Sequence, residues 1–332
     1  MANIFLTKKC NLKCPYCFAN EFVNKNQEEF SIENLIKVIN FITKDGTSRI
    51  GLIGGEPTLY SKFRELIKIL DKNNKVKDVI IYTNGIEIDK YINHLNPKKY
   101  SLLLNCNSPE QLGENYVKLK NNLLLLKKAN LTFKLGLNLW NSNFAYIFEL
   151  LKLINRNDLR FSYAIQNDKK VNNSNIIEEF KKQKSLLFDF FNACLIRNIV
   201  PSYDCNSFPD CIFTNEEKIL LVKIKQLAEK YDVDSPISSC RTCNPVIDIF
   251  PDLSAIRCFG LSDFSKINIS DFDNLEQLKR YYYAKIDIFA KISYVIPMCE
   301  NCKMRILNKC GICFAYKLSK IKKIKNYILS EE

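Results

Sequence analysis

The sequence has little histidine, tryptophan, methionine or glycine, and it has no long apolar run. One histidine, His94, stands among 332 residues, with one tryptophan, three methionines and nine glycines. With a single imidazole, a metal site must be built from thiolates, which favours zinc or iron–sulfur over copper or non-heme iron. No stretch reaches the roughly 18 apolar residues of a membrane span, and residues 1–6 do not indicate a secretory signal. We therefore expect a cytoplasmic protein without membrane contact.

Cysteine and positive charge, by contrast, are abundant. Fourteen cysteines in a chain with no export signal do not suggest a disulfide framework, because the cytosol keeps thiols reduced, so metal ligation is the better default. The net charge of +13 would suit an acidic partner such as nucleic acid, an acidic peptide or an acidic electron carrier. However, the lysines are spread along the whole chain, which favours ordinary solvated faces, and we do not expect nucleic acid as a partner.

Apolar, β-rich runs alternate with helical patterns through the first 200 residues. We expect helices between the strands, one of them capped by Ser31 and another at about 109–128. The expected strands lie at 3–6, 50–53, 79–82, 101–104, 133–139 and 161–165. Such alternation predicts an α/β fold with a parallel sheet and right-handed crossovers. The count fits a partial (β/α)6 barrel over residues 1–199, with its chemistry at the carboxyl ends of the strands.

From residue 200 onward, cysteines organise the sequence. Short apolar runs at 246–250 and 255–256 and an expected helix at about 274–290 lie among cysteines 205, 211, 240, 243, 258, 299, 302, 310 and 313. No internal repeat or low-complexity linker is present. We expect residues 200–332 to form a cysteine-rich extension of the barrel.

The most informative segment is the run from Cys10 to Cys17, directly after the first expected strand. Cys10, Cys14 and Cys17 stand at C-x3-C-x2-C spacing. Four thiolates usually hold an iron–sulfur cluster, so a loop that offers three leaves one iron open to another ligand. An open coordination position is what catalysis requires, by the logic that separates catalytic from structural zinc.

With Tyr16 before its last cysteine, this loop resembles the cluster-binding motif of the radical S-adenosylmethionine (SAM) superfamily. Gly54-Gly55-Glu56-Pro57, after the second strand, is similar to the family's GGE motif, and Thr83-Asn84-Gly85, after the third, to its T-N-G turn. The resemblance covers about 200 residues. A zinc site with a distant fourth ligand is the alternative for the three cysteines, but the agreement at residues 54–57 would then be accidental.

The resemblance implies that Cys10, Cys14 and Cys17 hold a [4Fe–4S] cluster and that SAM chelates the open iron. One electron, from a flavodoxin or ferredoxin, would cleave SAM to a 5′-deoxyadenosyl radical that abstracts hydrogen from a substrate. The asparagines Asn105, Asn107 and Asn138 are further candidates for SAM contact, although Asn at a strand end is as often a turn-former. The residues implied to bind SAM through the motifs are Tyr16, Gly54, Gly55, Glu56, Pro57, Thr83 and Asn84.

The later cysteines resemble the SPASM and twitch extensions of many peptide-modifying members of the family, although their spacing departs from the pattern and the final ligand is missing. The resemblance favours one auxiliary cluster on Cys240, Cys243, Cys258 and Cys313. A second set would comprise Cys299, Cys302 and Cys310, completed by Cys205 or Cys211 or left with an open iron. A zinc site on the two C-x2-C pairs at 299–302 and 310–313 is the alternative.

A loop with Cys205, Asp210 and Cys211 precedes these cysteines. It could supply a cluster ligand, or a redox or acid/base thiol with Asp210 as a proton acceptor at the barrel mouth. A structural turn is an equal alternative, because the loop consists of ordinary loop residues.

The resemblance points first to a maturase that installs a thioether or carbon–carbon crosslink in a ribosomally made peptide. A basic surface suits an acidic leader peptide, and because the first strand starts at about residue 3, leader recognition would need a separate protein or another surface of this chain. The alternative is a small-molecule enzyme, such as a dehydrogenase or a cofactor-biosynthesis enzyme with a twitch-type cluster. A zinc-stabilised nucleic-acid-binding protein ranks last, because it would have no use for a three-cysteine loop beside residues 54–57.

Overall fold

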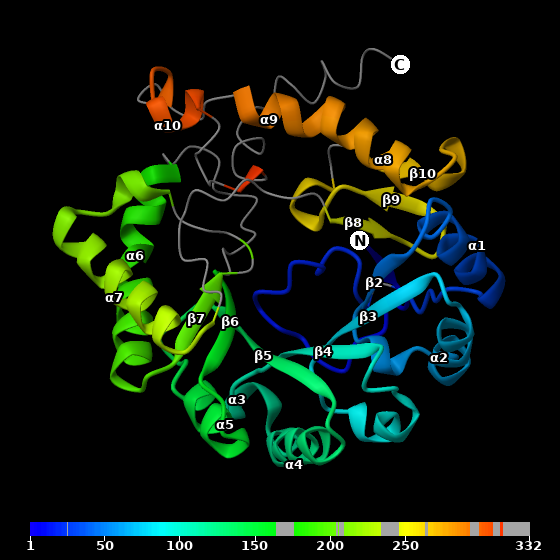
Figure 1. The fold of residues 1–332 in the computed structure, drawn as a ribbon, viewed down its shortest axis with the longest axis horizontal. Helices are drawn as coiled ribbons and strands as arrows, with labels where there is room; N and C mark the ends of the chain where they lie inside the picture. Colours follow the sequence, from blue (N-terminus) through cyan, green and yellow to red (C-terminus); the bar gives the residue numbers. More distant parts are fainter. Residues whose placement is uncertain are drawn as a thin grey trace. The chain divides into compact units, whose positions relative to one another are not determined.

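The chain folds as two compact units, whose helices and strands are labelled in Figure 1. The first comprises Met1–Lys134 and Pro245–Tyr283, and the second Leu135–Asn244 and Ala284–Glu332. This division follows packing, whereas the division at residue 200 was drawn from cysteine content and stays a prediction. The computed structural model describes residues 1–24, 26–163, 176–203, 205, 209–233, 246–262, 265–292, 299–307 and 313–314.

A mostly parallel sheet forms the centre of the first unit. Its strands lie in the order β10-β9-β8-β1-β2-β3-β4, in which β8 to β4 run parallel and β9 and β10 are antiparallel. The strands are β1 (Ala2–Phe5), β2 (Ser48–Ile53), β3 (Val76–Thr83), β4 (Tyr100–Asn105), β8 (Ile247–Ile249), β9 (Ser254–Ile256) and β10 (Ile267–Asn268). Because β1 to β4 are parallel, the segments that follow them emerge at one edge of the sheet.

The helices of the first unit begin and end at recognisable signals. Ser31 caps the helix after the cysteine loop, and its hydroxyl accepts the N–H of Asn34 at 3.1 Å. The single helix predicted at 109–128 is two helices, because the chain breaks at Gly113, whose φ is +54°. The α-helices are α1 (Ile32–Ile42), α2 (Phe63–Lys72), α3 (Pro109–Leu112), α4 (Asn115–Lys128) and α8 (Leu275–Tyr282), and the 3₁₀ helices are η1 (Pro57–Leu59), η2 (Ile88–Lys90), η3 (Ile92–His94), η5 (Phe259–Leu261) and η6 (Ile269–Asp271).

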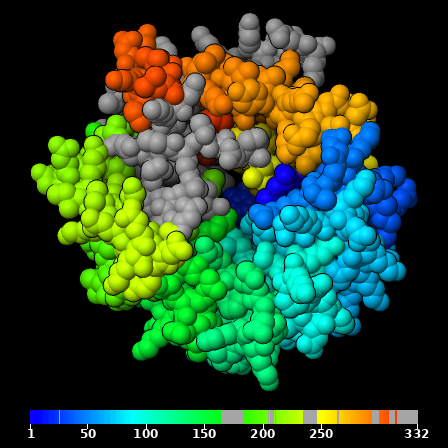
Figure 2. All heavy atoms as spheres, viewed as in Figure 1, coloured from blue at the N-terminus to red at the C-terminus, as the bar shows by residue number. Residues whose placement is uncertain are grey.

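The segment before α8 lies against the end of α1, as the orange and blue surfaces in Figure 2 show. Lys44 Nζ donates to the carbonyl of Asp273 at 3.0 Å, and Asn274 Nδ2 donates to Asp45 Oδ1 at 3.1 Å. Residues from late in the sequence are therefore built into the same unit as the first strands.

The second unit contains its own parallel strands in the order β5-β6-β7. Phe161 of β6 packs against Phe190 and Tyr203, with ring centroids 5.0 and 4.3 Å apart. Its elements are β5 (Thr132–Leu139, which carries the chain in from the first unit), α5 (Tyr146–Ile154), β6 (Asp158–Tyr163), α6 (Ile176–Ile196), β7 (Val200–Tyr203), η4 (Asp210–Ile212), α7 (Asn215–Lys230), the π-helix η7 (Tyr283–Asp287, which enters from the first unit), α9 (Ile288–Ile292) and α10 (Lys303–Ile306).

The predicted α/β fold with parallel strands is confirmed, and all six expected strands are present. What the sequence did not reveal is that the short run at 247–249 pairs in parallel with β1. A three-residue strand has too few residues to show a pattern, and its partner lies some 245 positions away. Over the part of the chain that the structure describes, no helix has the length and apolarity that crossing a membrane needs.

Candidate functional site

The cysteine loop is fixed to the segment after β2 by close backbone contact. The N–H of Gly55 donates to the carbonyl of Thr7, and the N–H of Glu56 to that of Lys9, both at 2.8 Å. A Cβ on Gly55 would lie 2.2 Å from the Lys9 oxygen, and one on Gly54 would lie 2.8 Å from the Thr7 oxygen. Both glycines are thus required by the approach of the protein's own backbone, a reason that the sequence reading, which invoked a ligand, had missed.

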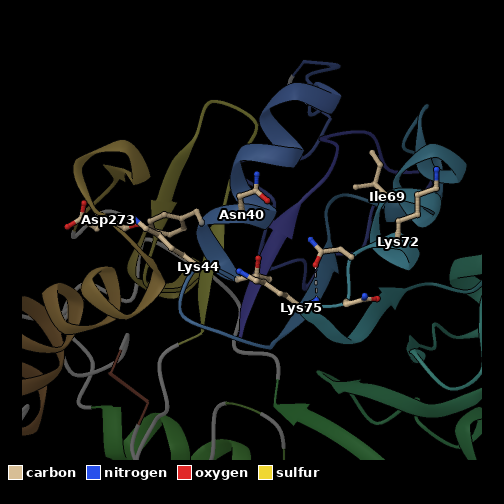
Figure 3. A pocket seen from close by; sticks show the side chains of 10 residues that line it. Asn40, Lys44, Ile69, Lys72, Lys75 and Asp273 are labelled. Carbon is tan, nitrogen blue, oxygen red and sulfur yellow. Dashed lines mark hydrogen bonds between the residues drawn. The ribbon is translucent and has the colours of Figure 1, made fainter.

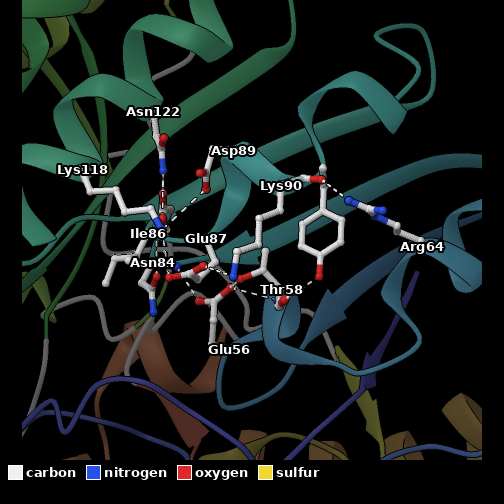
Figure 4. Close-up of polar contacts among 12 residues, drawn as sticks. Glu56, Thr58, Arg64, Asn84, Ile86, Glu87, Asp89, Lys90, Lys118 and Asn122 are labelled. Carbon is white, nitrogen blue, oxygen red and sulfur yellow. Dashed lines mark hydrogen bonds and ion pairs between the residues drawn. The ribbon is translucent and has the colours of Figure 1, made fainter.

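Glu56 joins the ends of β2 and β3. Its side chain is 1% exposed. Oε1 accepts the N–H of Thr58 at 3.1 Å and the hydroxyls of Thr58 and Thr83 at 2.7 and 2.6 Å, and Oε2 accepts the N–H of Asn84 at 2.8 Å (Figure 4). Burial raises the pKa of this carboxyl, and the four hydrogen bonds oppose the rise. Pro57 follows at the first position of η1, for which Glu56 is the cap.

The turn after β3 connects this carboxylate to the cysteine loop. Asn84 Nδ2 donates to Asn11 Oδ1 at 2.7 Å, and Asn84 Oδ1 accepts the N–H of Ile86 at 3.0 Å. Gly85 has a φ of +77°, which favours glycine. Asn11, inside the cysteine loop, was not among the predicted site residues, because its neighbours in the sequence give no sign of a contact 73 positions away.

Asn122 of α4 hydrogen-bonds to the same turn. Its side chain is 2% exposed, and Nδ2 donates to the carbonyl oxygens of Gly85 and Ile86 at 2.8 and 2.9 Å (Figure 4). Sequence reasoning missed this residue too. The available signal is its helical spacing, since Asn122 lies on the buried face of α4 with Leu119 and Leu126. A polar side chain on such a face needs a buried partner.

Asn107 contacts the cysteine loop from the segment after β4. It is 3% exposed, and its Nδ2 donates to Cys14 Sγ at 3.0 Å. Within the loop, the N–H of Leu12 donates to Cys10 Sγ at 3.4 Å. The predicted residues Cys10, Cys14, Glu56, Thr83, Asn84 and Asn107 thus belong to one connected set of contacts in the first unit.

The three thiols of the loop are half-buried, and burial raises the pKa of each. For Cys10 the pKa rises to about 12, to which the negative charge of Glu56 contributes. For Cys14, burial outweighs the hydrogen bonds from Asn107 and Tyr16, and for Cys17 it outweighs a backbone hydrogen bond. Thiols in such a setting become ligands when a metal displaces their protons.

An apolar cluster lies beside the last cysteine of the loop. Cys17 packs against it together with Phe22 and Phe259. The ring of Phe22 lies 4.9 Å from that of Phe250, and Phe259, which follows Cys258, lies 5.0 Å from exposed Phe18. The buried members are Phe5, Ala19, Ile53, Phe250 and Ile256. Cys17 therefore packs against an apolar cluster. Half-buried Cys258 directly precedes Phe259, which packs against the same cluster.

For several other predicted site residues, the structure gives the exposure and the element on which they lie. Asn105 is half-buried at the end of β4, and Asn138 is half-buried in β5 of the second unit. In the second unit, Cys205 and Cys211 are exposed, the latter within η4, and Cys313 is half-buried. The side chain of Asp210 and the residues Cys240, Cys243 and Cys310 lie outside the described part of the chain.

The pair Cys299 and Cys302 forms a tight turn in the second unit. The N–H of Cys302 donates to the carbonyl of Cys299 at 3.3 Å. The Arg305 guanidinium donates to the same carbonyl at 2.7 Å and to that of Ile292 at 2.6 Å. Among the residues that the structure describes, no three His, Cys, Asp or Glu side chains gather closely enough for a single metal ion. The metal ligands remain predictions.

A groove of about 770 Å³ lies away from the cysteine loop (Figure 3). It is formed by the ends of α1 and α2, by the segment 73–75 that leads into β3, and by Asp273. These segments precede β2 and β3, whereas the cysteine loop follows β1. Since the strands are parallel, the groove and the candidate site belong to opposite edges of the sheet.

The sequence of this chain is similar to a known protein family and to curated proteins. Residues 4–158 match the family model described as the Radical SAM superfamily. A GTP 3',8-cyclase of Clostridium perfringens (strain SM101 / Type A) is 28% identical over 218 residues, which cover 56% of this chain and 63% of the cyclase. The chain therefore spans less than two thirds of the length of that curated relative.

Two solved structures resemble the whole chain. The structure of anSMEcpe with bound AdoMet has a TM-score of 0.63 at 20% identity, covering 99% of this chain and 93% of that one. Streptococcus suis SuiB bound to S-adenosylmethionine has a TM-score of 0.62 at 14% identity, covering 95% and 72%. At these identities the likeness establishes the fold, and it confirms the expected partial-barrel architecture.

Proposed function

We propose that this chain, whose residues 4–158 match the Radical SAM superfamily model, is an enzyme that cleaves SAM reductively. The resulting radical would abstract a hydrogen atom from a peptide or protein. The observation that carries the proposal is the link between its three motifs. Asn84 donates to Asn11 of the cysteine loop, and its N–H donates to Glu56 of the Gly-Gly-Glu segment.

The residues present fit a [4Fe–4S] cluster. Cys10, Cys14 and Cys17 come from one loop and are half-buried, and the sulfurs of Cys10 and Cys14 accept hydrogen bonds from Leu12 and Asn107, which is the setting that thiolate ligands of a cluster need. When bound, the cluster and SAM supply the one-electron chemistry. The protein would hold and orient both groups and exclude water from them. The apolar cluster beside Cys17 is suited to excluding water.

We propose that SAM binds to the residues that the motifs predict, and that Glu56 and Asn84 are central among them. In the structure Glu56 Oε1 accepts three hydrogen bonds and Oε2 accepts one. A carboxylate has about four lone-pair sites, so the less occupied oxygen is the one suited to an ammonium group. Asn105, Asn107 and Asn138 stay candidates for additional contacts.

A peptide substrate is favoured by the structural neighbours. SuiB is also known bound to the precursor peptide SuiA, and anSMEcpe with the Kp18Cys peptide. We propose one or two auxiliary clusters on the later cysteines, an acid/base or ligand role for exposed Cys205 and Cys211 with Asp210, a flavodoxin or ferredoxin as electron donor, and a separate leader-binding protein, all in the cytoplasm. A small-molecule substrate is the second candidate, because the sequence relative is a GTP 3',8-cyclase.

Anaerobic reconstitution with iron and sulfide, followed by reduction with SAM, tests the cluster assignment. We expect 5′-deoxyadenosine from the wild type and none from a variant with Cys10, Cys14 and Cys17 all changed to Ala. Cys194→Ala, at a buried thiol of the second unit, is the matched control and should retain turnover. SAM cleavage by the triple variant, or bound zinc with no cleavage by the wild type, would refute the proposal.

Substrate class is tested by SAM cleavage in the presence of candidate substrates. A peptide encoded beside the gene should stimulate 5′-deoxyadenosine formation and change mass, and GTP should do neither. The opposite pattern would move the assignment to a small-molecule enzyme and leave the cluster site unchanged.

A further inference from the structure

Asn107 lies outside the cysteine loop, and its side chain donates directly to a ligand sulfur of the proposed cluster. Its Nδ2 lies 3.0 Å from Cys14 Sγ, and the side chain is 3% exposed. We infer that Asn107 is a positioning residue that sets the reduction potential of the cluster through Cys14. The inference rests on the proposed function, and it differs from the SAM contact that the sequence predicted for this residue.

The position of Asn107 is rigidly determined by its neighbours in the sequence. Cys106, before it, is buried, and its thiol hydrogen-bonds to the Leu104 carbonyl at 3.4 Å. Ser108, after it, is the N-cap residue of α3, and its N–H donates to Gln111 Oε1 at 3.3 Å. Both sequence neighbours of Asn107 thus make hydrogen bonds of their own, which helps to fix the segment that carries its amide.

A hydrogen bond to a ligand sulfur acts unequally on the two redox states. The reduced cluster carries one more negative charge, part of it on the sulfurs, so an N–H donor stabilises the reduced form more and raises the potential. The donor to Cys10 is a backbone N–H of the loop itself, that of Leu12. Asn107 instead follows β4, so it couples the potential to the position of a separate strand end.

The bond to Cys14 does not use the full hydrogen-bonding capacity of the Asn107 amide. A side-chain amide has two N–H groups and a carbonyl oxygen, and the bond to Cys14 engages one N–H. A ligand beside the cluster can thus contact the same amide. A substitution at Asn107 is therefore expected to change two separable quantities, the potential without SAM and the affinity for SAM.

The test is a redox titration of the reconstituted full chain followed by electron paramagnetic resonance, without SAM. The signal of this cluster is identified by its absence from the Cys10/Cys14/Cys17→Ala variant. We expect Asn107→Leu, which has a similar size and no donor, to shift the midpoint to more negative potential. Asn107→Asp, which replaces the donor by an acceptor, should shift it further. Asn121→Leu, on the exposed face of α4, should leave it unchanged.

The outcomes separate this inference from the proposed function. An unchanged midpoint in both Asn107 variants, with full iron content, would overturn the inference and leave the cluster site intact. If Asn107→Leu fails to hold iron, the near-isosteric Asn107→Asp decides, and a midpoint equal to or above that of the wild type refutes the inference. A cluster signal that survives in the triple cysteine variant would instead refute the proposed site.

Discussion

Among the described residues of the first unit, two deeply buried carboxylates have different surroundings. Glu56, at the end of β2, is 1% exposed, and Asp248, within β8, is 3% exposed. Glu56 accepts four hydrogen bonds from residues in two later segments. For Asp248 the side-chain donor is Asn3, whose Nδ2 lies 2.7 Å from Oδ1.

Asn3 and Asp248 are direct register partners in the sheet, so their bond joins two adjacent strands. The space for Asn3 exists because its other neighbour is Gly51, where a Cβ would lie 2.0 Å from Asn3 Oδ1. Among the described residues, no donor reaches that Asn3 oxygen. Burial raises the pKa of Asp248 to about 7, although the Asn3 hydrogen bond and the buried Arg257 charge lower it.

The comparison shows that burial does not by itself make a functional carboxylate. Glu56 has directional donors from separate elements, so its charge orders the edge of the sheet where the cysteine loop lies. Asp248 has a single side-chain amide donor, Asn3 of the neighbouring strand, and burial raises its pKa. Replacing each group tests whether this distinction holds.

The largest effect is expected for Glu56→Gln. The new amide N–H₂ would face a group that now donates a hydrogen bond to the carboxylate, so two donors would oppose each other. We therefore expect a loss of about 3 kcal/mol in the free energy of unfolding. Displacement of the site should lower SAM cleavage at least ~100-fold. Urea unfolding and 5′-deoxyadenosine formation measure the two.

Glu65→Gln, at an exposed position of α2, is the matched control and should stay within about 0.5 kcal/mol of the wild type. Wild-type stability and turnover in Glu56→Gln would show that the four hydrogen bonds do not order the site.

An effect of a different kind, a pH dependence of stability, is expected at Asp248. Its folded-state pKa of about 7 lies above the ordinary 3.8, so the folded chain binds this proton more tightly. The stabilisation is complete below about pH 4 and is lost as the pH rises through 7, with a slope of at most about 1.4 kcal/mol per pH unit. Asp248→Asn should flatten the curve of unfolding free energy between these values.

Urea denaturation at a series of pH values measures that slope, with exposed Asp271→Asn as the control that keeps it. If Asp248→Asn retains the wild-type slope, another group is responsible and the contrast with Glu56 fails at this point.

The smallest effect is expected for Asn122→Ala, which removes two donors from the turn that Glu56 holds from its other side. Leaving the Gly85 and Ile86 carbonyls unpaired should cost about 2 kcal/mol. Asn121→Ala, its exposed neighbour, should change stability by less than about 0.5 kcal/mol. Equal thermal shifts for the two variants would mean that the turn does not depend on α4.

How much of the fold could be predicted from the sequence depends on whether the sequence signal lies in neighbouring residues. Apolar periodicity and capping are properties of neighbouring residues, so the six strands and the Ser31 cap were predictable. The break at Gly113 was missed because a glycine inside a helical pattern does not reveal its φ. The strand at 247–249 was missed because three residues show no periodicity and its partner is β1.

By itself, the sequence determined the resemblance to the radical SAM superfamily, through cysteine spacing and two short motifs after successive strands, because those residues are contiguous. Only the tertiary structure decided which side chains join the motifs to one another. Asn11 meets Asn84, Asn107 meets Cys14 and Asn122 supports the Gly85 turn, across 73, 93 and 37 positions. An asparagine is unremarkable in a sequence, and it acquires a role only when folding removes water and leaves a particular donor or acceptor as its partner.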